Sequence, residues 1–298
     1  CIKRGPNAGR FLFHMKYYEE CAAGSAVTPP GPTTLRTDHP NYAAGITLNF
    51  VASNDISPDC YNTGLEYKCG MARPNPYYGG ATKEFIYQSN PINLNGVPPA
   101  TGWHFWWYNC CRPATIVNVT AGGFVLRAIM YPYNAQTTNT CYDSSPQFST
   151  SPSSILCIGY NFSYNHNATD EEVDSLSFSW GLGLGNQASN TIWNPTPVTF
   201  AGGYSQFSQL PSPTQNPANQ AATLNPYTGE INFTSFTPGA FATVVQVTAY
   251  KCGQKVAEIF RDLPVALLNC PNNPSTSTYN KPPDVSINGS PVSINGGY

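Results

Sequence analysis

Residues 241–250, FATVVQVTAY, are followed by KCGQK at 251–255 and VAEIFRDLPVALL at 256–268, and this stretch decides the fold class. Both long runs are rich in β-branched and aromatic residues, which favour extended strands. Gly253, between them, can adopt the positive φ that a tight hairpin turn requires. We therefore expect the two runs to pair antiparallel as neighbours in a β-sheet.

Strand-like runs recur along the rest of the chain. Phe11, Phe13 and Met15 alternate with their neighbours, which is the period-2 pattern of a strand. Further runs of this character, bounded by Gly, Pro and Asn, lie at residues 45–51, 114–119 and 124–131. Because no window shows a sustained helical period, the sequence predicts an all-β fold of tandem β-sandwich domains.

The chain of 298 residues carries few charges. Asp, Glu, Lys and Arg make up 10% of it, against about 25% in an ordinary soluble domain, whereas Gly (25), Pro (28) and Tyr (19) are abundant. A formal net charge of -2 provides no basic field for a phosphate backbone, so we expect no nucleic-acid partner. This profile is not typical of a cytosolic protein.

Ten cysteines, an even number, indicate disulfides formed in an oxidising compartment. The alternative, a metal site, would need clustered Cys-x2-Cys or Cys/His pairs, which the sequence lacks. The predicted bridging residues are Cys1, Cys21, Cys60, Cys69, Cys110, Cys111, Cys141, Cys157, Cys252 and Cys270. Their connectivity stays open, and the pairs nearest in sequence are Cys60/Cys69, Cys141/Cys157 and Cys252/Cys270.

The adjacent Cys110 and Cys111 have two interpretations, a redox-active vicinal pair or members of two separate bridges. Successive residues of a strand point to opposite faces. We therefore expect each of the two thiols to meet a different partner in a structural bridge.

No apolar run approaches the roughly 20 residues of a membrane-spanning helix, so we expect no transmembrane segment. No signal peptide precedes Cys1, which fits either a lipid-modified Cys1 or a chain that begins within a longer protein. Because Cys1 leads almost directly into a strand-like run, and not into a flexible tether, we prefer the second interpretation.

The chain divides into two predicted domains and a tail. Residues 1–141 form a disulfide-rich β-sandwich domain, and residues 142–270 form a second one that contains long loops between 181 and 220. Residues 271–298 contain the near-repeat of Ser-Ile-Asn-Gly at 286 and 293, and we expect a linker or the start of a further module.

Seven stretches of the chain together carry a family resemblance. They are Tyr17-Tyr-Glu-Glu-Cys21, Glu84-Phe-Ile-Tyr-Gln88, Trp107-Tyr-Asn-Cys-Cys-Arg-Pro-Ala-Thr-Ile-Val-Asn118, Ser145-Pro-Gln-Phe148, Tyr164-Asn-His-Asn-Ala-Thr-Asp170, Leu224-Asn-Pro-Tyr-Thr-Gly-Glu-Ile-Asn-Phe-Thr234 and the closing piece from Val247 to Cys270 with Arg261-Asp262. In their order and spacing they resemble Bacteroidota surface proteins of the gliding-motility and type IX secretion class. The second half also resembles the cadherin-like and Ig-like modules of large adhesins.

This resemblance implies Ig-like or cadherin-like sandwiches in a large secreted or cell-surface protein. The implied function is structural and adhesive, namely attachment to surfaces or cells, within an oligomeric or filamentous appendage. The implied partners are other modules of the same polypeptide, further copies of the chain, and an extracellular surface or glycan. Fold analogy alone does not assign a function, so these are expectations.

Asp170, Glu172 and Asp174 stand where the related modules carry an Asp-rich, Gly-containing turn that often binds calcium. Calcium takes six to eight oxygen ligands, and three carboxylates supply several of them. Glu172 and Val173 depart from the related pattern, since Val173 replaces the Gly that tightens the turn. The alternative is a solvated acidic turn. In the same turn, Asp174-Ser175-Leu176 matches a short O-glycosylation pattern on Ser175.

The run from Trp103 to Tyr108 is aromatic on both faces of its predicted strand. We interpret it as a strand buried under a second layer. The alternative is a carbohydrate-binding module, whose aromatic platform would be formed by Trp103, Trp106, Trp107 and Tyr108.

The sequence contains no recognised catalytic motif. It has four histidines and lacks the His-Glu-x-x-His, Gly-x-Ser-x-Gly and phosphate-loop patterns. Paired carboxylates of a secreted glycoside hydrolase are spatial and cannot be located from sequence. We therefore expect a non-catalytic protein without a cofactor, apart from the candidate calcium ion.

Overall fold

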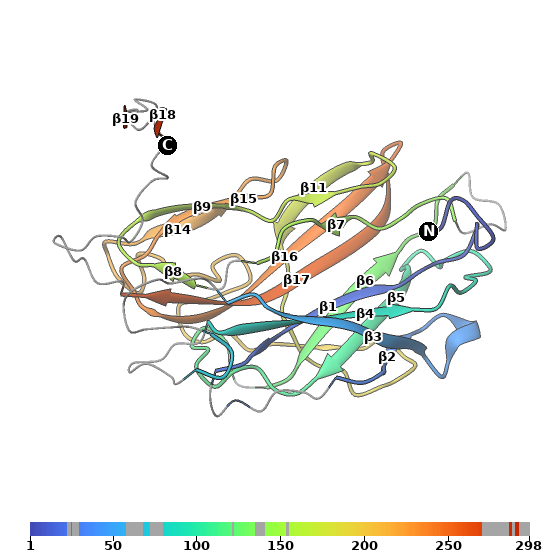
Figure 1. Cartoon of the computed structure of the whole chain (residues 1–298), viewed down its shortest axis with the longest axis horizontal. Helices are drawn as coiled ribbons and strands as arrows, with labels where there is room; N and C mark the ends of the chain where they lie inside the picture. The colour runs from blue at the N-terminus through green and yellow to red at the C-terminus, as the bar shows by residue number, and fades with distance from the viewer. Residues whose placement is uncertain are drawn as a thin grey trace.

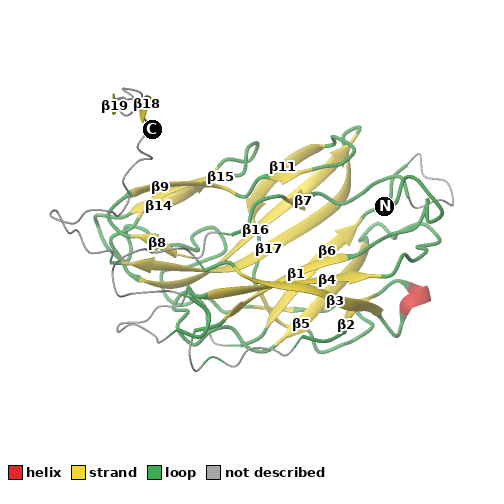
Figure 2. Ribbon diagram, in the orientation of Figure 1, coloured by secondary structure: helices red, strands yellow, loops and turns green. Residues whose placement is uncertain are grey.

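The structure is a computed structural model that describes residues 1–22, 25, 30–57, 68–71, 80–120, 122–134, 141–152, 155–269, 286–287 and 290–291. Strands dominate these residues, and their helical structure is a single 3-10 turn, η1 (Pro40–Tyr42) (Figures 1 and 2). The all-β fold class is confirmed. No helix in this part of the chain has the length and apolar character needed to span a bilayer.

The main sheet follows the order β1-β4-β3-β2-β5-β6-β17-β16-β11, and β8 also pairs with β17. Its strands are β1 (His14–Glu20), β2 (Thr33–Thr37), β3 (Ile46–Asp55), β4 (Thr82–Ser89), β5 (Trp103–Asn109), β6 (Phe124–Met130), β8 (Ile155–Cys157), β11 (Ser175–Trp180), β16 (Gly239–Lys251) and β17 (Gln254–Leu268). Most of its neighbouring strands are antiparallel, whereas β8 runs parallel to β17.

Smaller sheets complete the fold. A three-stranded sheet has the order β14 (Gln220–Leu224), β15 (Glu230–Thr234) and β9 (Asn161–Asn165). The two-stranded sheets are β7 (Gln147–Phe148) with β10 (Ala168–Thr169), β12 (Leu184–Asn186) with β13 (Thr196–Pro197), and β18 (Ser286–Ile287) with β19 (Ser290–Pro291).

The hairpin expected between residues 241 and 268 is present as β16 and β17. Lys251 pairs with Gln254, which leaves Cys252 and Gly253 as the two turn residues. Both have positive φ, 49° and 79° respectively. Positive φ at both central residues defines the turn whose twist matches that of paired strands, so the glycine serves the predicted purpose.

The first core lies between two layers. Strands β1, β4 and β3 cover strands β5 and β6, and β2 connects the layers because it pairs with both β3 and β5. The Tyr17 ring of β1 lies 5.0 Å from that of Trp107 in β5, and it also stacks on Phe124 of β6. The apolar face predicted for residues 11–17 therefore packs on the aromatic strand.

The second core lies between the β16-β17-β11 end of the main sheet and the three-stranded sheet. Phe233 of β15 and Phe178 of β11 are buried there against Phe241 and Val245 of β16. Figure 1 shows β9, β14 and β15 as a layer above β16 and β17. Each end of the main sheet is therefore one wall of a sandwich.

Both cores lie on the same side of the main sheet. Ala128 of β6 is the register partner of Phe105 in β5 and of Ile259 in β17. Paired residues point to the same face of a sheet, and Phe105 belongs to the first core while Ile259 packs on the second. The seam between the two cores is therefore bridged by the pairing of β6 with β17.

Part of the loop-rich segment 181–220 covers the opposite face of the main sheet at β5 and β6. Leu184 and Trp193 from this segment pack on Trp106 and Val125 of β5 and β6. The segment therefore lies across strands of the first half. The predicted boundary near residue 141 stays a prediction, because strands from both halves share one sheet.

The strand expected at 114–119 is absent and is replaced by isolated bridges of Ile116 and Val119 to other segments. The side chain of Asn118 takes over part of the pairing. Its amide donates to the carbonyls of Gln209 and Ala242 and accepts from the Ala242 N–H. A buried side-chain amide thus satisfies backbone groups of β16 that a neighbouring strand would otherwise pair with.

Candidate functional site

The predicted aromatic platform is largely inside the protein. Trp103 and Trp107 belong to the first core, and Trp106 is buried on the opposite face of β5 under Trp193. Tyr108 alone of the four predicted residues is exposed, at 41%. A sugar ring cannot reach the three tryptophans, so a stacking platform built from them is wrong. The reason is the burial on both faces that a doubly apolar strand indicates.

The predicted calcium ligands do not converge. Glu172 forms an ion pair with Lys3 at 2.6 Å, and Asp174 forms one with Lys251 at 2.6 Å. Asp170 accepts hydrogen bonds from the backbone N–H groups of Glu172 and Asp174. Lysines and backbone N–H groups therefore contact several of the carboxylate oxygens that calcium would need. This geometry does not favour a calcium site, which stays a prediction.

The one group of described residues with metal-ligand spacing is Cys21, Asp55 and Cys69. Its two sulfurs lie at disulfide distance, and Asp55 accepts hydrogen bonds from the backbone N–H groups of Ser57 and Cys69. Sulfurs joined to each other offer no thiolate to a metal ion. This group is therefore better described as a cysteine pair with a supporting carboxylate.

Two of the sequence-near cysteine pairs, Cys60/Cys69 and Cys141/Cys157, are wrong, because Cys69 and Cys141 each lie beside a different cysteine. Cys1 and Cys141 lie at disulfide distance, with 5.4 Å between their Cα atoms, and so do Cys21 and Cys69, with 4.6 Å. The Gly70 N–H donates to the Cys21 carbonyl, which places segment 68–71 beside the end of β1. Cys157 is disulfide-bonded, and Cys252 is free and exposed. Cys60 and Cys270 lie outside the described residues.

Cys110 and Cys111 lie at disulfide distance from each other, and the peptide bond between them is cis. The expectation of two separate bridges is therefore wrong. Alternation of side chains holds only within a strand, and β5 ends at Asn109.

Arg112, directly after the cysteine pair, forms a buried ion pair with Asp262 of β17. Its two terminal nitrogens donate to the two carboxylate oxygens, with distances of 2.7 and 2.5 Å. Burial acts to lower the pKa of Arg112, but the negative charge of Asp262 outweighs it and holds this pKa above its ordinary value. The ion pair links two motifs that lie 150 residues apart. Sequence reasoning missed it, although both motifs belong to the stretches that carry the family resemblance.

Arg261, the residue before Asp262, points to the other face of β17. Its guanidinium stacks over the Phe148 ring at 4.2 Å, donates to the Thr150 carbonyl and lies 3.4 Å from the His166 ring nitrogen. Burial, with the nearby Arg261 charge, lowers the pKa of His166 to about 3. His166 is therefore neutral at physiological pH.

A third charged cluster closes the far end of the β16-β17 hairpin. Lys251 donates to Asp143 at 3.0 Å and to Asp174 at 2.6 Å. Burial raises the pKa of Asp143 to about 7, and a hydrogen bond with Asp174 acts in the same direction against the effect of Lys251. The cluster joins the segment after Cys141 to the start of β11.

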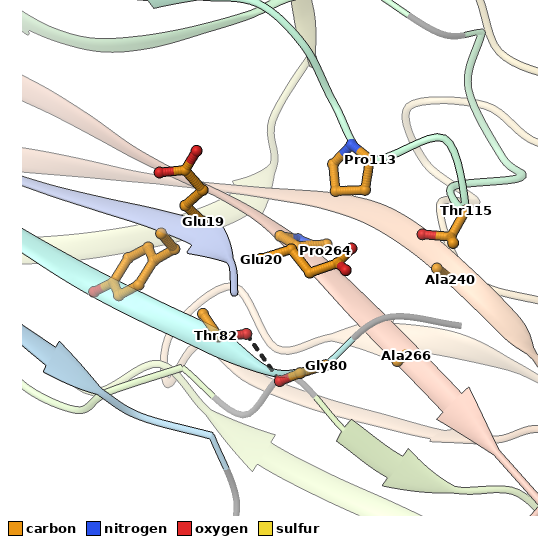
Figure 3. A pocket seen from close by; sticks show the side chains of 10 residues that line it. Glu19, Glu20, Gly80, Thr82, Pro113, Thr115, Ala240, Pro264 and Ala266 are labelled. Carbon is orange, nitrogen blue, oxygen red and sulfur yellow. Dashed lines mark hydrogen bonds between the residues drawn. The ribbon is translucent and has the colours of Figure 1, made fainter. Parts of the chain in front are cut away.

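A small hollow lies at the seam between the two cores (Figure 3). Glu19 and Glu20 at the end of β1 line it together with Pro113 and Pro264. Glu20 accepts a hydrogen bond from Ser25. We name the region formed by Cys110, Cys111, Arg112, Asp262 and this hollow the joint.

Ser175, the predicted O-glycosylation residue, is exposed at the first position of β11. Its position leaves the hydroxyl accessible, and the modification itself stays a prediction.

Comparison with known proteins gave no relative for this chain. A scan against protein-family models and searches of curated proteins and of solved structures found no match.

Proposed function

We propose that the chain is a non-catalytic, disulfide-braced segment of a large secreted or cell-surface protein that holds a fixed shape outside the cell and mediates attachment. The family resemblance to Bacteroidota gliding-motility and type IX-secreted adhesins, with cadherin-like or Ig-like sandwiches, supports this proposal. The partners would be further modules, sister copies, and an extracellular surface or glycan.

The observation that carries the proposal is the joint. A bidentate Arg112–Asp262 pair, with side chains only 5% and 8% exposed, fastens the segment after β5 to β17. Beside it, β6 and β17 share one sheet. Two sandwiches held by a sheet and a buried ion pair resist bending better than two domains on a flexible linker.

Cysteine pairs brace the same arrangement. Cys1–Cys141 would close a loop of 140 residues around the first core, and Cys21–Cys69 would close one of 48 residues. Each such bridge restricts the unfolded chain and contributes about 2–4 kcal/mol. That contribution to stability suits a protein that lies outside the cell, where disulfides persist.

The buried titratable groups are used in structural contacts, which supports a non-catalytic role. The pair most like a catalytic dyad is His104 with Asp38, whose side-chain atoms are 2.7 Å apart. The His104 side chain is only 11% exposed, and its ring stacks on Trp193 at 4.9 Å. A general base needs hydrogen-bond reach to its substrate, and this packing denies it.

A bead-attachment experiment tests the proposal. Beads coated with the oxidised protein through a C-terminal tag are passed under flow over bacterial cells, polysaccharide films and glass. The expected result is retention on at least one of these surfaces, with retention lost after reduction and alkylation of the cysteines. Retention on none of them, together with release of reducing sugar from the polysaccharide films, would show a hydrolase instead.

A further inference from the structure

We propose that the outer face of the β14-β15-β9 sheet binds a neutral polysaccharide chain. This inference rests on the proposed function, because it names the ligand class through which attachment occurs. The binding surface is a set of polar side chains, here called the polar grid, formed by Asn161, Ser163, Gln220, Thr223, Asn232 and Thr234.

The register of the three strands arranges the polar grid in two rows. Gln220 pairs with Thr234, which pairs with Asn161. In the second row, Thr223 pairs with Asn232, which pairs with Ser163. Neighbouring strands are about 4.8 Å apart, and same-face residues along a strand are about 7 Å apart. The six side chains therefore form a regular array.

The sequence dictates which way these residues face. Phe162 and Phe233 alternate with the grid residues in Asn161-Phe-Ser163 and Asn232-Phe-Thr234, and they are packed in the second core. Side chains alternate across a strand, so the polar residues must face outward. Asn161, Ser163 and Thr223 are indeed exposed.

Two amides of the grid have hydrogen-bonding groups to offer. The Thr234 hydroxyl donates to Oε1 of the Gln220 side chain, and the Thr223 hydroxyl donates to the Asn232 backbone carbonyl. By contrast, the side-chain amides of Asn161 and Asn232 have no hydrogen-bond partner among the described residues. Each amide carries both a donor and an acceptor, which is the combination that a sugar hydroxyl needs.

The grid is almost free of charge. Among the outward-facing positions of the three strands, Glu230 alone is charged, and its carboxylate accepts the Ser163 hydroxyl. A neutral array of donors and acceptors gives no electrostatic attraction to a polyanion or a polycation. It matches a ligand that presents many hydroxyl groups and no net charge.

An aromatic ring borders the grid. Phe236 lies just beyond the end of β15 and is 44% exposed. Its N–H donates to the Asn219 side chain at 2.7 Å, which fixes the backbone there, and its ring lies beside Gly159 at the approach to β9. An exposed ring next to hydrogen-bonding groups suits a pyranose, whose C–H face is apolar and whose edge is polar.

Affinity electrophoresis tests this inference. The folded oxidised chain is run through gels that contain hydroxyethylcellulose, mixed-linkage β-glucan or galactomannan, with alginate as the charged comparison. We expect retardation by at least one neutral polymer and none by alginate. The triple variant Asn161→Ala/Asn232→Ala/Phe236→Ala should lose about tenfold in affinity, a factor that corresponds to about 1.4 kcal/mol. The control variant Asn190→Ala changes an exposed amide in the loop on the opposite face and should bind normally.

Three results would overturn the inference. The first is that no neutral polymer retards the protein, and the second is that the triple variant is retarded as strongly as the original protein. The third is a concentration-dependent dimer in ultracentrifugation that the triple variant abolishes, which would make the grid a contact between copies. Circular dichroism and melting temperature confirm that the variants fold. If the grid fails while coated beads still adhere to cells, the proposed function stands and only the ligand assignment falls.

Discussion

The Arg112 guanidinium, in the segment that follows β5, faces the Asp262 carboxylate of β17, with two nitrogens against two oxygens. The two charges are paired with each other, and both side chains are buried. Their contact fastens the two halves of the molecule at the point where β6 meets β17. It therefore makes a direct prediction about stability.

Arg112→Met should destabilise the protein strongly, by about 3–5 kcal/mol, because it leaves the Asp262 carboxylate buried and unpaired. The double variant Arg112→Met/Asp262→Leu removes both charges and should recover most of this loss. Urea unfolding of the three proteins measures the effect. A double variant as unstable as the single one would show that the ion pair itself, and not its desolvation, stabilises the joint.

Val173→Gly should stabilise the protein by about 0.5–1 kcal/mol. Val173 has φ 62° and is 88% exposed, so its side chain buries little area and strains the backbone. A left-handed conformation costs about 1–2 kcal/mol for a residue with a Cβ, and glycine's entropy offsets part of the gain. Val173→Ala keeps the Cβ and should change the melting temperature little. Equal stabilisation by Ala and Gly would contradict the explanation.

Lys251→Met should destabilise the protein by about 3 kcal/mol at pH 8, because it strands the buried carboxylates of Asp143 and Asp174. The loss should shrink at pH 5. Asp143, with its pKa raised to about 7, is protonated there and needs no cation. Lys3→Met removes the more exposed pair with Glu172 and should cost about 1 kcal/mol or less. A Lys251→Met effect that is independent of pH would contradict this account.

His166 should make the protein sensitive to acid. Its folded-state pKa is about 3, against about 6.5 in the unfolded chain, so between these values only the unfolded state binds the proton. The stability that this group contributes is complete above pH 6.5 and decreases as the pH falls, by up to about 1.4 kcal/mol per pH unit. His166→Asn should flatten the dependence of unfolding free energy on pH between 6.5 and 4. An unchanged slope would assign the acid sensitivity to other groups.

Local chemistry along the chain determined the fold class and much of the second core. The alternation in residues 241–268 and the glycine at 253 specify β16, β17 and their turn, because strand direction and turn geometry depend on neighbouring residues. The doubly apolar run at Trp103 likewise indicated burial on both faces. The outward position of the polar grid can also be predicted from the sequence, since Asn-Phe-Ser and Asn-Phe-Thr each place phenylalanine between two polar residues.

Only the tertiary structure decided which distant residues meet. Cys1 with Cys141, and Arg112 with Asp262, are joined by strand order, and strand order is not encoded in local spacing. For the same reason the three carboxylates at 170, 172 and 174 were expected to meet a cation in common, yet Lys3 and Lys251 arrive from far along the chain and take two of them. Local pattern fixes each residue's face, whereas packing fixes its partner.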